Sequence, residues 1–174
     1  MKALIVVDVQ NDFVTGSLGS IAAQNIIPEV RALVEKFTIN GDAIYFTQDT
    51  HEIDYLRTQE GQKLPIEHCR YGSFGWQIID EINIKPTLNN SIFYLHKNSF
   101  GYNAWEDLEL DKYEEIWICG LISSICVITN ALLIKTFYPE IPIKFIAYAS
   151  AGLSPENHKA ACEVMRSCQI EVIE

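Results

Sequence analysis

The chain has 174 residues, of which 48% are hydrophobic and 21% charged, so it can bury a core and does not have the composition of a disordered polypeptide. This length is typical of one domain, and we expect residues 1–174 to fold as a single unit. Thirteen Lys and Arg against 23 Asp and Glu give a net charge of −10, which disfavours nucleic acid and anionic membrane surfaces as partners.

The cysteines and the first residues indicate the compartment. Five cysteines, an odd number without a CxxC pair, are typical of reduced thiols. The apolar run after Lys2 is short and ends at Asp8, so it does not resemble an export signal. No stretch approaches the ~20 apolar residues of a membrane span. These features predict a cytoplasmic protein.

Short apolar runs alternate with helical patterns along the chain. We expect strands at Ala3–Val7, Ala43–Phe46, Ile92–Leu95, Ile116–Cys119, Ile143–Ile146 and Ile170–Ile173. Alternation of strands and helices predicts an α/β fold with a parallel sheet, helices on both of its faces and right-handed crossovers.

Three helices and one long loop can be located from the pattern. An apolar stripe over residues 26–37 predicts an amphipathic helix that ends at Asn40-Gly41. Residues 125–137 are apolar on nearly every side, which predicts a central, buried helix. Ser154-Pro155-Glu156 is a typical start for the last helix. Residues 48–75 are polar and too long for an ordinary connection, so we interpret them as a functional loop region.

Polar residues follow four of the predicted strands directly, and ligands of open parallel sheets bind at the carboxyl ends of strands. In chain order these residues are Asp8, then Asp49 and His51, then His96 and Lys97, and finally Gly120, which leads to Cys126. We therefore expect an acid, a possible metal pair, a base and a thiol at one edge of the sheet.

Each candidate also has a simpler explanation. Asp8 can act as a buried base or only cap the following turn. Cys126 lies near a predicted helix N-terminus, where the helix dipole favours a thiolate, but cysteines in apolar helices are more often inert core residues. Lys97 can stabilise both an ionised Asp8 and a thiolate, or it can be a solvated loop lysine.

The long polar loop also contains candidate metal ligands. Asp49, His51 and the later His68 offer one carboxylate and two imidazoles, a set that zinc and ferrous iron accept. The D-x-H spacing often arises by chance, and His68 alone would be interpreted as a structural residue. The three together make a metal site plausible.

Several segments match a known family in combination. They are VVDVQNDFVTGSL at 6–18, DTH at 49–51, PIEHC at 65–69, Lys97 and CGLISSICVITNAL at 119–132. With these segments the chain resembles the isochorismatase-like cysteine hydrolases, and within them the nicotinamidase/pyrazinamidase branch. The resemblance extends over nearly the full chain. It implies a doubly wound, three-layer α/β/α fold with a mostly parallel sheet of about six strands, in agreement with the pattern of strands and helices.

The resemblance implies roles for particular residues. The family's catalytic triad corresponds to Asp8, Lys97 and Cys126. Its metal ligands correspond to Asp49, His51 and His68, with zinc the first expectation and iron or manganese as alternatives. It also implies a cis peptide bond between Leu121 and Ile122, with the amides of Ile122 and Cys126 forming the oxyanion hole.

The reaction implied by the resemblance is hydrolysis of a small carboxamide, nicotinamide in NAD salvage, through a thioester. The metal would bind the pyridine nitrogen and position the ring, and Phe13, Tyr102 and Trp105 are candidates for an aromatic wall around it. By analogy we also expect a homo-oligomer. Two alternatives stay open: a relative that cleaves another small amide or an N-carbamoyl compound, and a catalytically silent binding or assembly module.

The chain departs from the family pattern at three places. Many relatives have Trp before the Pro of the metal segment, where this chain has Leu64. A second loop histidine that ligates the metal in some nicotinamidases would fall near Tyr55 or Arg57. The usual Thr-Asp after the cis peptide is Ser123-Ser124. None of these changes affects the triad.

Overall fold

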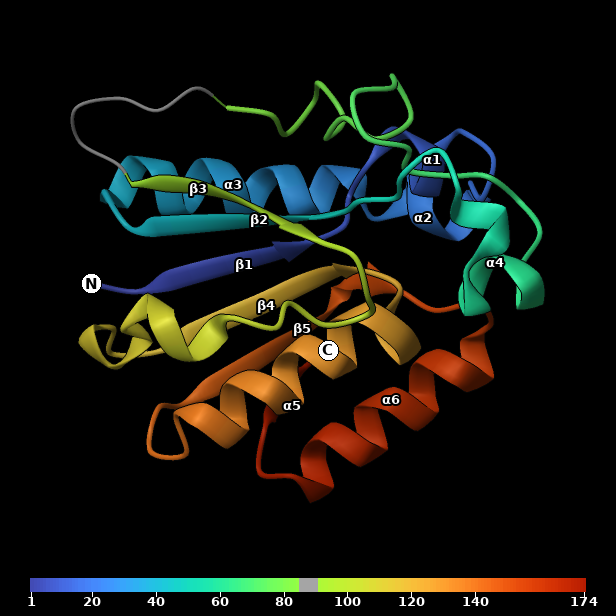
Figure 1. Ribbon diagram of the computed structural model, residues 1–174. Helices are drawn as coiled ribbons and strands as arrows, with labels where there is room; N and C mark the ends of the chain where they lie inside the picture. Colours follow the sequence, from blue (N-terminus) through green and yellow to red (C-terminus); the bar gives the residue numbers. More distant parts are fainter. Residues whose placement is uncertain (85–90) are drawn as a thin grey trace.

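In the computed structural model, which describes residues 1–84 and 91–174, a six-stranded sheet lies between two layers of helices (Figure 1). Its strands are β1 (Ala3–Val7), β2 (Ala43–Asp49), β3 (Ile92–Lys97), β4 (Ile116–Leu121), β5 (Ile143–Ala151) and β6 (Glu171–Ile173). They pair in the order β3-β2-β1-β4-β5-β6, and every pair is parallel. The predicted fold class is confirmed.

Helices and single turns connect the strands. The α-helices are α1 (Asn11–Val14), α2 (Ile21–Asn25), α3 (Ile27–Asn40), α4 (Gln59–Lys63), α5 (Ile128–Phe137) and α6 (Pro155–Ser167). The turns are η1 (Tyr55–Arg57), η2 (Trp105–Leu108), η3 (Leu110–Lys112) and the π-helical η4 (Ser123–Val127). In Figure 1, α3 covers one face of the sheet, and α5 and α6 lie on the other. Within the described residues, no helix combines the length and apolarity that crossing a membrane requires.

Two apolar cores explain the continuous apolar runs of the strands. Ala3, Ile5 and Val7 of β1 belong to the core beneath α5 and α6, whereas Leu4 and Val6 belong to the core beneath α3. A strand covered on both faces needs apolar residues at every position, which is why its sequence does not alternate with polar residues.

The predicted ends of two helices are confirmed. Gly41 follows α3 in a left-handed conformation (φ 72°), which a residue without a Cβ adopts easily. Ser154 precedes α6, and its side chain accepts a hydrogen bond from the Asn157 amide. These short local signals depend on the backbone of one turn, so they can be read from the sequence.

The prediction of a fully buried central helix is wrong for α5. Ala131 and Ile134 are buried against the sheet, but Leu132 and Leu133 stay partly exposed. The helix forms part of an outer layer, so only one of its sides meets the core. The helical segment also begins with the π turn η4 rather than directly as an α-helix.

The order of the strands determines where a ligand can bind. The chain runs from β1 outward to β3 on one side, and then from β4 outward to β6 on the other. The sheet therefore has a topological switch point between β1 and β4, and ligands of such sheets bind beyond the carboxyl ends of the strands at that point.

Candidate active site

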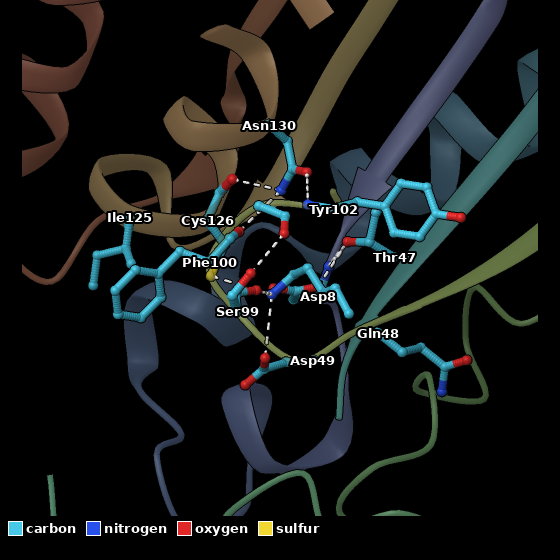
Figure 2. A network of polar contacts seen from close by, with 12 residues as sticks. Asp8, Thr47, Gln48, Asp49, Ser99, Phe100, Tyr102, Ile125, Cys126 and Asn130 are labelled. Atoms are coloured by element: carbon cyan, nitrogen blue, oxygen red, sulfur yellow. Dashed lines mark hydrogen bonds and ion pairs between the residues drawn. The ribbon is translucent and has the colours of Figure 1, made fainter. Parts of the chain in front are cut away.

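The carboxyl ends of β1, β3 and β4 bring Asp8, Lys97 and Cys126 together. Lys97 Nζ lies 2.7 Å from Asp8 Oδ2 and 3.6 Å from Cys126 Sγ. Asp8 is wholly buried, and the side chains of Lys97 and Cys126 are nearly so. Figure 2 shows this network at the ends of the strands. An acid, an ammonium group and a thiol therefore share one site shielded from water.

Asp8 is held in place by the neighbouring strand β2. The backbone at Asp8 has a positive φ of 51°, which turns the chain as it leaves β1. Thr47 donates a hydrogen bond of 2.7 Å to Asp8 Oδ1. Burial raises the pKa of Asp8, and the Lys97 charge opposes that shift. One oxygen of the Asp8 carboxylate thus accepts a hydrogen bond from Thr47, and the other faces the Lys97 ammonium group.

Burial and two neighbouring charges act on the Cys126 thiol in this environment. Burial raises its pKa well above the ordinary value, the negative charge of Asp8 adds to this shift, and Lys97 opposes it. Desolvation and the nearby carboxylate thus oppose the thiolate that we expect the helix N-terminus to favour, and Asp8 is an adjacent group that can accept the thiol proton.

Lys97 connects the thiol to the candidate metal ligands. Burial alone would lower its pKa, but Asp8, Cys126 and Asp49 together raise it, so the ammonium group stays charged. Its Nζ lies 3.2 Å from Asp49 Oδ1 and donates to the Ser99 carbonyl at 3.0 Å. Lys97 thus bridges two buried carboxylates.

Asp49, His51 and His68 meet as expected, and a fourth residue joins them. Glu60 on α4 completes a set whose ligand atoms all lie within 4.8 Å of one another. Glu60 was not predicted, since it lies in a polar loop rich in acids. The only local signal that we find is Thr58, a typical N-cap residue that caps α4 by accepting from the Gly61 amide; the position of Glu60 beside the histidines depends on how the loop folds.

The four residues fit a divalent metal ion. His68 Nδ1 donates to the Ile66 carbonyl at 2.8 Å, so Nε2 carries the free lone pair on the side of Asp49, 3.4 Å from its Oδ2. His51 Nε2 lies 2.9 Å from the same carboxylate oxygen. Burial opposes ionisation of Asp49, but the two histidines and Lys97 hold its pKa well below the usual range. Two nitrogen and two oxygen donors are a set that zinc and similar ions accept.

Tyr55 and Arg57 occupy the region where a further loop histidine was considered. The Tyr55 ring packs against the rings of His51 and His68, with centroids 4.5 and 5.0 Å away. Its hydroxyl donates to the Leu64 carbonyl. Tyr55 therefore supports the two imidazoles by packing, and the fourth candidate ligand is Glu60.

A cavity of about 230 Å³ lies between the thiol and the metal ligands. Cys126 is on its wall, together with Asp49, Glu60 and His68. The other lining residues are apolar: Phe13, Leu18, Leu64, Phe100, Ile122, Ile125 and Leu153. This volume is below the ~300–1,000 Å³ of sites for drug-sized ligands, and the lining is mostly apolar, so the cavity suits a small, mostly apolar molecule.

Of the three residues predicted for the aromatic wall, only Phe13 lines this cavity. Trp105 is fully buried in the core beneath α5, and its indole N–H donates to Asn130. Tyr102 packs beside Trp105 and not in the lining. The prediction for Tyr102 and Trp105 is wrong, because the loop turns these rings toward α5 and leaves Phe100 at the cavity.

The backbone between β4 and η4 has unusual geometry. The Leu121–Ile122 peptide bond is cis, as the resemblance implied, and Ile122 lines the cavity. Gly120 has a φ of 117°, and a Cβ there would lie 2.3 Å from the Val7 carbonyl. Only glycine allows β4 to pass this close to β1 at the switch point.

With the parallel sheet, the buried Asp, Lys and Cys group and the cis peptide described, the comparisons with known proteins can be considered together with the geometry of the site. Residues 2–174 match the Isochorismatase domain, and the chain belongs to the isochorismatase family. The chain is similar to the nicotinamidase of Schizosaccharomyces pombe, with 27% identity over 207 aligned positions that cover 98% of this chain and 92% of the relative.

Solved structures with similar folds include nicotinamidases and pyrazinamidases. A nicotinamidase/pyrazinamidase from Bacillus subtilis has a TM-score of 0.86 at 27% identity and covers 99% of both chains. A pyrazinamidase of Pyrococcus horikoshii in complex with zinc has a TM-score of 0.82 at 25% identity and covers 99% of this chain and 98% of the other. The predicted membership in the nicotinamidase branch is confirmed.

Proposed function

We propose that this chain is a metal-assisted cysteine amidase that hydrolyses nicotinamide and similar small aromatic carboxamides to the acid and ammonia. One observation carries the proposal: the Cys126 thiol, which Lys97 links to Asp8, lines the same 230 Å³ cavity as three of the four candidate metal ligands. The names of the relatives, nicotinamidases and pyrazinamidases, support this substrate class.

The proposed reaction begins with proton transfer from the Cys126 thiol to Asp8. The sulfur then attacks the carboxamide carbon, and the backbone amides of Ile122 and Cys126 stabilise the oxyanion. When the C–N bond breaks, Asp8 returns the proton to the departing ammonia. Water cleaves the resulting thioester, releases the acid and restores the thiol. Lys97 keeps Asp8 ionised and offsets the negative charge that forms on the sulfur.

Asp49, His51, His68 and Glu60 are the residues that would hold the metal, with zinc as our first choice and iron or manganese as alternatives. A bound divalent ion would supply a Lewis acid that holds the pyridine nitrogen of the substrate. The apolar cavity wall, including Phe13 and Phe100, would then exclude water from the ring.

The charges of the cavity favour a neutral carboxamide over an N-carbamoyl amino acid. A substrate that carries a carboxylate needs a cation in its site. The described lining has neither Arg nor Lys, so the metal ion that Asp49 and Glu60 would hold is the cation such a substrate would meet there, in competition with a pyridine nitrogen. Lys97 is already paired with Asp8 and Asp49. A silent binding module is disfavoured for another reason: burying Asp8 and Lys97 costs free energy of folding, which a purely structural protein could avoid with apolar residues.

Ammonia release from nicotinamide tests the proposal. We would measure wild type, Cys126→Ala and metal-depleted wild type before and after zinc is added back. We expect Cys126→Ala to lose at least ~10³-fold in kcat, because no nucleophile remains. Cys168→Ala is the matched control, since this thiol lies at the end of α6.

Each outcome of that assay has a distinct meaning. Turnover that survives in Cys126→Ala would refute the thioester mechanism. Full activity after complete metal removal would show that the reaction does not need a metal ion. Hydrolysis of an N-carbamoyl compound but not of nicotinamide would keep the mechanism and reject the substrate. The cytoplasmic location and the homo-oligomer stay predictions; gel filtration with light scattering tests the oligomer.

A further inference from the structure

Asn130 makes four hydrogen bonds in a fully buried position one helical turn after Cys126. Its Nδ2 donates to the Cys126 carbonyl at 2.7 Å and to the Phe100 carbonyl at 3.2 Å. Its Oδ1 accepts from the Tyr102 amide and from Trp105 Nε1, both at 2.8 Å. Figure 2 shows this side chain between the start of α5 and the loop. One amide group therefore connects the nucleophile's backbone to three residues of a different segment.

That segment, which we call the clamp loop, comprises residues 98–105 and directly follows Lys97. Lys97 Nζ donates to the Ser99 carbonyl within this loop, and Phe100 lines the cavity. Its position therefore affects both the ammonium group and the cavity wall.

The clamp loop also packs closely on α5 at Gly101. A Cβ at that position would meet Leu133 Cδ1 at 2.5 Å and Thr129 Cγ2 at 2.9 Å. This close approach is independent of the Asn130 hydrogen bonds, and both contacts hold the loop in the same place. Because α5 continues directly from the turn that carries Cys126, the loop and the thiol have a common support.

We infer that Asn130 is a positioning residue that keeps the Cys126 thiol, the Lys97 ammonium group and the Phe100 side chain in fixed positions relative to one another. It does not touch the substrate cavity and acts through the backbone of Cys126 and of the clamp loop. Small displacements of reacting groups cost large factors in rate, so loss of this arrangement lowers turnover more than substrate affinity. This inference rests on the proposed amidase function for its kinetic readout only.

Asn130→Asp tests the inference with almost no change in shape. The second carboxylate oxygen would replace Nδ2 and face the carbonyls of Cys126 and Phe100, which cannot donate to it. We expect kcat for nicotinamide to fall ~10²-fold with a smaller change in KM. We also expect slower alkylation of Cys126 by iodoacetamide, followed by peptide mass spectrometry. If Asn130→Asp does not fold, Asn130→Ser, which keeps one hydroxyl donor, is measured for the same changes.

Tyr138→Phe is the matched control. The Tyr138 hydroxyl at the far end of α5 donates to the carbonyls of Trp105 and Glu106, so the variant loosens the same junction away from the thiol. It should lower Tm and leave both kcat and the Cys126 alkylation rate unchanged. Equal losses of kcat in both variants, or wild-type kcat and alkylation in Asn130→Asp, would overturn the inference. If wild type does not hydrolyse nicotinamide, the proposed function fails, and the alkylation rates alone decide the role of Asn130.

Discussion

At the scale of single residues, the candidate site is a group of buried charges that balance one another. Lys97 lies between Asp8 and Asp49, and Asp49 also contacts His51 and His68. Taking such groups out of water costs free energy, which their mutual attraction offsets only in part. Their placement therefore reflects chemistry more than stability.

Removing the fourth candidate ligand should weaken metal binding without unfolding the chain. Glu60 is only partly buried on a short helix, so Glu60→Gln removes one charge and one donor and leaves the core unchanged. We expect the affinity for Zn²⁺ to fall at least ~10–100-fold, the range seen when even outer partners of a metal are lost. Isothermal titration of the metal-depleted protein with zinc measures this directly.

Glu52→Gln is the matched control for that experiment. Glu52 is an exposed acid next to His51 in sequence but outside the ligand set. Glu52→Gln therefore removes the same negative charge near the site without removing a candidate ligand. An equal loss of zinc affinity in both variants would mean that Glu60 acts only by its charge and is not a ligand.

At the scale of elements, α6 depends on its first turn. The Ser154 side chain accepts from the Asn157 amide at 3.2 Å and satisfies one of the free N–H groups of the helix start. We expect Ser154→Ala to lower the free energy of unfolding by about 1 kcal/mol, measured by urea denaturation with an unchanged m value.

Ser167→Ala provides the comparison within the same helix. Its hydroxyl donates to the Glu163 carbonyl in the last turn, where no N–H group needs a partner. This variant should differ from wild type by less than about 0.5 kcal/mol. A loss as large as that of Ser154→Ala would show that the two serines act by propensity and not by capping.

At the scale of the whole molecule, the two ends of the sheet have different electrostatics. At the end opposite the candidate site, Glu115 lies 2.5 Å from Lys2 Nζ and 2.8 Å from Lys144 Nζ, and it accepts from Trp117. Burial opposes ionisation, but these partners lower the pKa of Glu115 to about 2. Glu115 thus connects the beginnings of β1, β4 and β5.

That lowered pKa predicts how stability depends on pH. A carboxylate with a pKa of 4.5 when unfolded and about 2 when folded stabilises the protein above pH 4.5, and this contribution is lost as the pH falls toward 2. We expect Glu115→Gln to be less stable than wild type by about 1 kcal/mol at pH 7, with the difference disappearing at low pH. Thermal unfolding between pH 2 and 7 measures it.

Glu163→Gln, an exposed carboxylate on α6, is the control for the general loss of one negative charge. A stability difference for Glu115→Gln that persists unchanged down to pH 2 would contradict the ionic explanation. In that case the glutamine would act through packing alone.

Much of the fold and part of the site could be predicted from the sequence. The six strands, the end of α3 and the start of α6 follow from local patterns of apolar and capping residues. The convergence of Asp8, Asp49 and Lys97 follows from their positions directly after apolar runs, because parallel strands end at one edge. The chain itself thus determines which residues reach that edge.

Only the tertiary structure decided what depends on distant parts of the chain. Glu60 joins the metal ligands because the polar loop folds α4 over them. Trp105 turns into the core because Asn130 accepts its indole N–H from another element. The pKa of Cys126 is raised because burial and Asp8 act on it together. Burial, ring orientation and pKa arise from groups far apart in sequence, so no local pattern contains them.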